Sequence, residues 1–136
     1  SNSDNGGTGT LRYQIENACP GDVIQFDPSL SNSTIVLNSE IAVNQNFSVI
    51  GLGINSLSIS GNNASRIFSI NTGVTFSVSA LSLINGYSSS NGGAFLNNGD
   101  LQLENINFAG NKNGLTSKAF TNIGTVTMAN SVNVLD

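Results

Sequence analysis

The chain has 136 residues, a length that suits a single domain spanning 1–136. Only 9% of its residues are charged, against roughly 25% in an ordinary globular protein. Its net charge of −4, with four scattered cations, argues against a nucleic-acid partner. No apolar run approaches the ~20 residues of a membrane span. With no histidine and one cysteine, we expect no cofactor, no metal site and no intramolecular disulfide.

The first predicted element is a short amphipathic helix within the N-terminal cap segment 9–20. Thr10 is a suitable N-cap for it, and Pro20-Gly21 is a suitable stop. We expect the helix to lie over the open end of the first coil and to cover its unpaired strand edges. Cys19 is then expected to be buried as a small apolar residue, with a reactive thiol as the alternative. The apolar residues at helical spacing are Leu11, Ile15, Ala18 and Cys19.

The region 23–136 reads as short strands that are separated by Gly, Asn, Asp and Ser. Many of these segments alternate apolar and polar residues, which is the period of a half-buried strand. Asn-Gly pairs supply the positive φ that tight turns need. The predicted strands are 23–26, 34–37, 41–43, 47–52, 56–60, 66–70, 74–84, 94–96, 101–108 and 125–134.

Matched residues recur along these strands at a step of about 25 residues. Phe76, Leu101 and Val126 form one such series. Val78, Leu103 and Met128 form a second series, and a looser step of 27 residues leads from Ile41 and Val43 to Phe68 and Ile70. A period of this length indicates stacked repeats, here a parallel β-solenoid with about three strands per coil. The alternative is an antiparallel sandwich with accidental similarity, which would not need equal spacing.

The positions of the carboxylates indicate whether the chain could be a polysaccharide lyase or hydrolase. Such an enzyme would need paired acids on one face of the solenoid. The repeat places Asp100 between Val74 and Thr125, and Glu104 between Ser79 and Ala129. Neither acid then has a carboxylate neighbour in the next coil. We therefore expect a chain without catalytic residues, unless a loop brings two acids together.

Two further features have competing interpretations. Asn105 and Asn130 share a register, and we expect their amides to bond from coil to coil, with a sugar- or ice-binding ladder as the alternative. Arg66 is expected to be solvated, although an ion pair with Asp27 or Glu40 is the alternative.

The last coil carries apolar residues in the pattern of a coil from the middle of a stack. Nothing after it resembles a cap, so we expect an apolar cross-section and a row of unpaired backbone groups. Either further coils of a longer chain or other copies of the chain would cover this end, and head-to-tail contacts that do not close produce a fibre. The candidate self-association residues are Phe120, Ile123, Val126, Met128, Val132 and Val134.

Several stretches resemble bacterial secreted and cell-surface β-helix proteins with polymorphic-outer-membrane-protein-like repeats. The N-terminal stretch "TLR" with Ile15, followed by "GDVIQF" at 21–26, is similar to the cap and first coil of that family. "GGAF" at 92–95 and "FAGN" at 108–111 resemble its paired repeat signatures. The following repeat, at 119–134, lacks both the double glycine and the F-x-x-N pattern. The resemblance implies an all-β, right-handed parallel β-helix of about 4–5 coils and an extracellular location.

Together these features predict a non-enzymatic structural or adhesive protein, secreted to the bacterial cell surface. Its expected partners are other copies of itself or further coils, and host or surface glycans or proteins. The alternatives are a fragment of a carbohydrate-active β-helix enzyme and a glycan-binding module.

Overall fold

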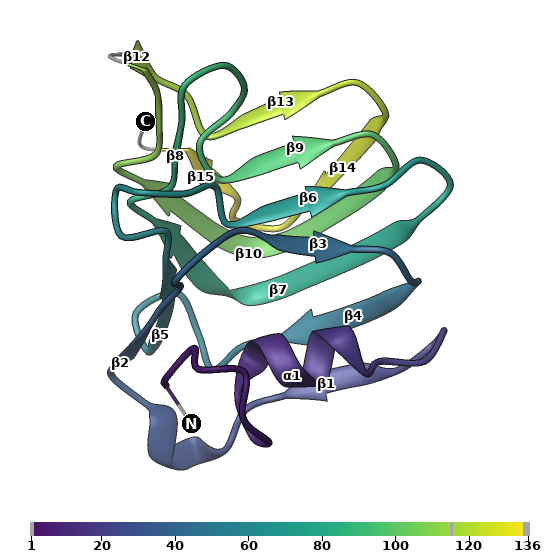
Figure 1. Cartoon of the computed structure of the whole chain (residues 1–136), viewed down its shortest axis with the longest axis vertical. Helices are drawn as coiled ribbons and strands as arrows, with labels where there is room; N and C mark the ends of the chain where they lie inside the picture. The colour runs from purple at the N-terminus through teal and green to yellow at the C-terminus, as the bar shows by residue number, and fades with distance from the viewer. Residues whose placement is uncertain (1, 115, 135–136) are drawn as a thin grey trace.

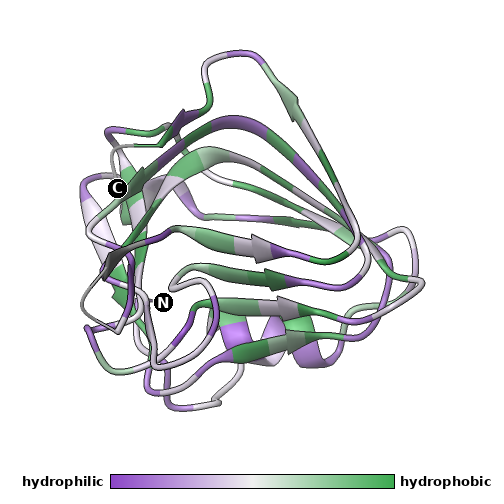
Figure 2. Cartoon of the chain, turned by 90° about the horizontal axis from the view of Figure 1, so that it is seen from above, coloured by the Kyte–Doolittle hydropathy of each residue, from purple (hydrophilic) through white to green (hydrophobic). Residues whose placement is uncertain are grey.

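Parallel strands wind around a column of apolar side chains in this molecule. The computed structural model describes residues 2–114 and 116–134. Within them the chain forms a parallel β-solenoid of about four turns with one short N-terminal helix, α1 (Leu11–Glu16). The helix lies at the lower end of the stack and the last strands lie at the upper end (Figure 1). Seen along the stack, successive turns lie over one another around a common interior (Figure 2).

Each turn contributes strands to three walls, and each wall continues from turn to turn. The first wall contains β1 (Val23–Gln25), β4 (Phe47–Ile50), the first half of β7 (Thr75–Ile84), the first half of β10 (Asp100–Ala109) and β14 (Thr125–Ala129). The second wall contains β2 (Ser33–Val36), β5 (Leu57–Ser60), the second halves of β7 and β10, and β15 (Asn133–Val134). The third wall contains β3 (Ile41–Val43), β6 (Phe68–Ile70), β9 (Phe95–Asn97) and β13 (Phe120–Asn122).

The remaining elements lie at the corners. Strands β8 (Tyr87–Ser88), β11 (Lys112–Asn113) and β12 (Thr116–Ser117) form a small corner sheet, in which β11 and β12 pair antiparallel. A 3₁₀ turn, η1 (Pro28–Leu30), follows β1. Asp27 caps this turn by accepting the N–H of Ser29 at 2.8 Å, and this bond lowers the pKa of the Asp27 carboxyl.

The strand register confirms the repeat that the sequence predicts. Leu101 pairs with Phe76 on one side and with Val126 on the other. Leu103 likewise lies between Val78 and Met128. Ile41 pairs with Phe68 in the third wall, as the 27-residue step requires. The predicted neighbour of Asp100 is wrong by one residue, because Asp100 pairs with Thr75 and not with Val74.

The core is continuous along the stack because inward positions recur at the same place in every turn. Six phenylalanine rings are in contact in series along it, with centroids 5.1 to 6.0 Å apart, from Phe47 to Phe120. Edge-on and offset ring contacts of this kind add to the stabilisation from burial. Fully enclosed side chains include Ile35, Val43, Val49, Ile59, Phe68, Phe76, Phe95 and Phe108.

The asparagine ladder lies elsewhere than the sequence analysis placed it. Asn105 and Asn130 both adopt left-handed backbone conformations, with φ of 50° and 47°. They are linked from turn to turn by a backbone bond, since the Asn105 N–H donates to the Asn130 carbonyl at 3.1 Å. Amide bonds from coil to coil join Asn97 to Asn122, with Nδ2 donating to Oδ1 at 2.8 Å, and Asn71 to Asn44.

The sequence analysis did not predict every strand. The short corner strands β8, β11 and β12 have no apolar alternation, and β13 is not among the predicted strands. The cap helix is shorter than the predicted segment 9–20, because it ends at the C-cap Asn17 before Pro20-Gly21 is reached. In the part of the chain that the structure describes, no helix has the length and hydrophobicity that crossing a membrane requires.

Replacing Leu103 by Asp tests the register directly. Leu103 is 2% exposed and lies between two apolar residues of the adjacent turns. An unpaired charge at this position should cost more than about 4 kcal/mol and unfold the protein, as circular dichroism on heating would show. The matched control is Ser69→Asp at an outward position of β6, which should change stability by about 1 kcal/mol or less. An unchanged melting curve for Leu103→Asp would contradict the register.

Candidate functional site

The helix α1 packs against the N-terminal end of the stack and contacts β3. Leu11 and Ile15 are each 4% exposed and belong to the core, and Ala18 packs against its edge. Thr10 is the N-cap, and its hydroxyl accepts the N–H of Tyr13 at 3.2 Å. The prediction that Cys19 is buried is wrong. The helix has already ended there, and Cys19 lies in a turn where its own N–H donates to the Asp22 carboxylate at 2.8 Å.

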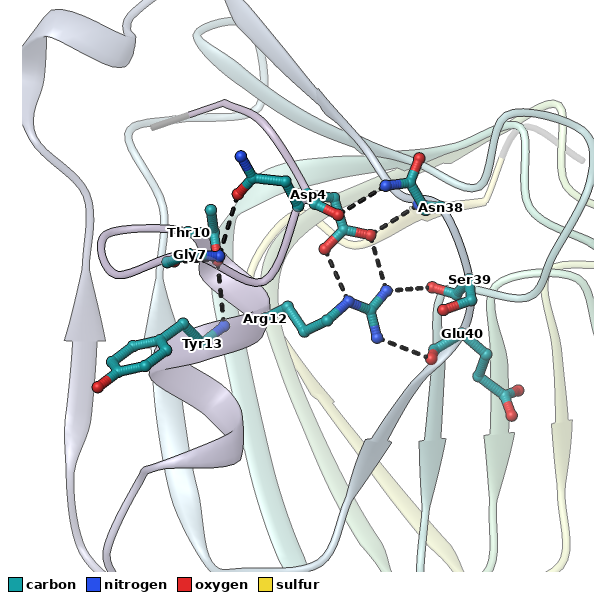
Figure 3. A network of polar contacts seen from close by, with 9 residues as sticks. Asp4, Gly7, Thr10, Arg12, Tyr13, Asn38, Ser39 and Glu40 are labelled. Atoms are coloured by element: carbon teal, nitrogen blue, oxygen red, sulfur yellow. Dashed lines mark hydrogen bonds and ion pairs between the residues drawn. The ribbon is translucent and has the colours of Figure 1, made fainter.

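An arginine fork holds this cap on the stack (Figure 3). Arg12 donates from Nε and Nη2 to the two carboxylate oxygens of Asp4, at 2.8 and 2.7 Å. It also donates to the carbonyls of Ser39 at 2.7 Å and Glu40 at 3.2 Å, just before β3. Asp4 in turn accepts the backbone N–H of Asn38 at 2.7 Å. The network thus joins the N-terminal segment, the helix and the entry to β3.

The Asp4–Arg12 pair is shielded from water and well matched. The side chain of Asp4 is 1% exposed and that of Arg12 is 16% exposed. Hydrogen bonding to Asp4 is the main reason that the pKa of Arg12 is raised above its ordinary value. No periodic pattern in the sequence indicates this ion pair, because Asp4 lies in a glycine-rich segment without strand or helix pattern.

A second arginine is also paired, contrary to expectation. Arg66 forms an ion pair with Glu40, which the sequence analysis named only as the alternative. It also donates to the carbonyl of Gly92 and to the hydroxyl of Ser88, both at 3.0 Å. Arg66 therefore ties three successive turns together at one corner.

The C-terminal end of the described stack has exposed strand edges. In the described ranges, β14 ends the first wall and pairs with β10 alone, while β13 ends the third wall and pairs with β9 alone. At the other end of the described stack, β1 and β2 are edge strands as well, paired with β4 and β5 alone, while the edge strand of the third wall, β3, contacts α1. No helix lies over β13 and β14 (Figure 1). The two ends of the stack are thus different surfaces.

The six candidate self-association residues all lie at this upper end, but they are not equivalent. Phe120, Val126 and Val132 are partly buried and pack against the core from above. Met128 and Val134 are each 46% exposed, although the residues they continue in the turn below, Leu103 and Phe108, are almost fully buried. The difference arises because the last turn has a neighbour on one side only. Ile123 is 71% exposed and lies in the turn after β13, so it does not continue a core position.

The carboxylates do not gather into a site. Asp100 has threonines as its neighbours in adjacent turns, and Glu104 has Ser79 and Ala129. Across residues 2–114 and 116–134, no group of three or more His, Cys, Asp or Glu side chains is placed to hold a metal ion. One oxygen of Asp100 is buried and has no hydrogen-bond partner among the described residues. A neutral residue is therefore expected to be tolerated there.

Comparison of this chain with family models, with curated proteins and with solved structures gives no match.

Truncating Arg12 to Ala should loosen the cap. It would leave the Asp4 carboxylate buried without its ion pair, and the expected loss is about 3 kcal/mol of unfolding free energy. The measurement is urea unfolding followed by circular dichroism. The matched control is the double variant Asp4→Ala/Arg12→Ala, which removes both charges and should cost less than Arg12→Ala alone. A loss below about 0.5 kcal/mol for the single variant would show that the fork does not hold the cap.

Proposed function

We propose that this chain is a non-enzymatic structural or adhesive module, secreted to the bacterial cell surface, and that its last turn is a surface on which a further β-coil stacks. The observation that carries the stacking proposal is the contrast between the two ends. One end is covered by a helix that an arginine fork fastens. The other presents unpaired strand edges with half-exposed Met128 and Val134. The extracellular location is supported by the sequence resemblance and by the uncharged polar composition.

The partner that fits this surface is another parallel β-coil. Edge strands pair readily with an additional strand, because their outer N–H and C=O groups are unsatisfied. Two sources could supply this coil, namely further coils of a longer chain and a second copy. A turn adds 4.7–4.9 Å to the stack, whereas a helix is about 10–12 Å across. In an intact second copy, α1 would therefore keep the first turn of that copy away from β13. Further coils of the same chain would carry no such helix between themselves and β13.

The charge distribution favours unlike ends in any contact between copies. Residues 1–40 hold five acids and a single cation, so the whole net charge of −4 lies in the capped part of the chain. Residues 41–136 hold three cations and three acids. Two capped ends would repel each other, whereas a capped end meets no net repulsion from the last turn.

Lysine substitution in the last turn tests the stacking surface. Because α1 keeps a second copy from full contact with the last turn, we expect the purified chain to associate weakly and reversibly, and only at high concentration, as sedimentation velocity would show and electron microscopy would image. Met128→Lys and Val134→Lys should each weaken this association by about tenfold or more, because a charge would enter an apolar contact. Both side chains are half exposed, so the melting temperature should hardly change.

The matched control for these variants is Ile50→Lys, a similarly exposed position in an interior strand. It should leave association unchanged. Monomers at every concentration, with no effect of the lysines on sedimentation, would contradict self-stacking.

A polysaccharide enzyme predicts a different result. We expect no turnover of polygalacturonate, since the register gives neither Asp100 nor Glu104 a second carboxylate. The measurement is release of reducing ends and of unsaturated products. Turnover that is lost in Asp100→Ala would replace the structural proposal with the enzyme.

A further inference from the structure

A shallow groove of about 290 Å³ crosses the outer face of the first wall. It runs parallel to the axis of the stack, on the side of the solenoid, over β4, β7, β10 and β14. Its outward-facing lining residues form two columns. One column is Ser48, Ser77, Gln102 and Thr127, and the other is Ile50, Ser79, Glu104 and Ala129.

The groove follows a bend that recurs in successive turns. Ala80 in β7, Asn105 in β10 and Asn130 after β14 all have left-handed backbone conformations, with φ of 58°, 50° and 47°. Each follows directly on a groove residue, namely Ser79, Glu104 and Ala129. The strand changes direction at this residue and continues into the second wall. The stacked bends therefore lie along one side of the groove.

Several polar groups in the groove have no partner within the protein. The hydroxyls of Ser48, Ser79 and Thr127 make no hydrogen bond to any described residue. Gln102 and Glu104 are held in place, since Gln102 Oε1 accepts from Ser77 at 3.1 Å and Glu104 Oε1 accepts from Asn130 at 2.8 Å. The backbone groups of β4, β7 and β10 are taken up by parallel ladders on both sides of each strand. Any ligand of the groove is therefore recognised by side-chain hydroxyls, one amide and one carboxylate.

The groove is also partly apolar. Ile50 is 38% exposed, and it and Ala129 present hydrocarbon between the hydroxyls. Val49, Val78 and Leu103 lie beneath, with their side chains buried in the core. An apolar lining with a small number of oriented polar groups is the usual composition of a ligand site. A sugar ring matches it, with C–H groups on its face and hydroxyls at its rim.

The charges of the residues that line the groove limit the kind of glycan that it can bind. None of the four cations, Arg12, Arg66, Lys112 and Lys118, lines the groove, whereas the exposed carboxylate of Glu104 does. An acidic glycan would meet this carboxylate without a compensating cation. We propose that the groove binds a neutral, unbranched glycan along the axis of the stack. This inference does not depend on the last turn being a stacking surface.

The test is a titration of ¹⁵N-labelled protein with neutral hexasaccharides, followed by amide chemical shifts. The probes are the β-1,4-linked glucose, β-1,4-linked xylose and α-1,4-linked glucose hexamers, each up to about 10 mM, which is ten times an expected dissociation constant of about 1 mM. At least one probe should shift amides of β4, β7, β10 and β14. Hexagalacturonate, the acidic comparator, should bind more weakly than the neutral probe that binds best.

Three variants test whether the glycan binds in the groove. Ser79→Val removes an unpartnered hydroxyl at a strand position that favours β-branched residues, and it should weaken binding about twofold to tenfold. Ser69→Val makes the same change on the outer face of the third wall, and it should leave binding unchanged. Glu104→Gln should improve binding of hexagalacturonate, because it removes the only charge in the groove lining.

Three results would overturn the proposal. The first is the absence of shifts with all three neutral probes. The second is tighter binding of hexagalacturonate than of every neutral probe to the wild-type chain. The third is a set of shifts confined to the last turn, around Ile123 and Val126, with no response to Ser79→Val.

Discussion

Parallel pairing between successive turns, at a step of 24 to 29 residues, is the constraint on which this structure depends. Each inward residue lies over the equivalent residue of the turn below, so Phe76, Leu101 and Val126 form one column of the core. Side chains alternate between the two faces of a strand, so a shift of one residue would turn the apolar set toward water. The repeat length, the apolar core and the polar exterior therefore all follow from the same strand register.

The ends of such a stack differ physically from its middle. A middle turn is buried by a neighbour above and a neighbour below, and an end turn has one neighbour. At the N-terminal end, α1 and the Asp4–Arg12 fork replace the missing turn. On the last described turn, Met128 and Val134 are half exposed at positions where the turn below has buried residues. This asymmetry is the physical basis for proposing a stacking role, and the polar side of the rod remains free for a different ligand.

The wall strands could be located from the sequence because apolar alternation and turn residues are local signals. Strand β3 was predicted with its observed bounds, and the longer strands β7 and β10 were predicted to within one or two residues. "GGAF" was recognised as a motif, and the structure supplies its reason. A side chain at Gly93 would lie 2.5 Å from the backbone nitrogen of Lys112, so this corner has room for glycine alone. The short corner strands carry no alternation and could not be found in the same way.

What the sequence determined by itself was the period, the strand positions, the parallel stack and the helix at its start, because these follow from residue patterns that repeat or that lie close together in the chain. What the tertiary structure alone decided were contacts between residues with no shared pattern. Asp4 meets Arg12 and the carbonyls before β3, Arg66 meets Glu40, and Cys19 is exposed where the helix has ended. The groove belongs to the same class. Its lining comes from four successive strands of the first wall, and columns of that kind exist only after the turns have been laid over one another.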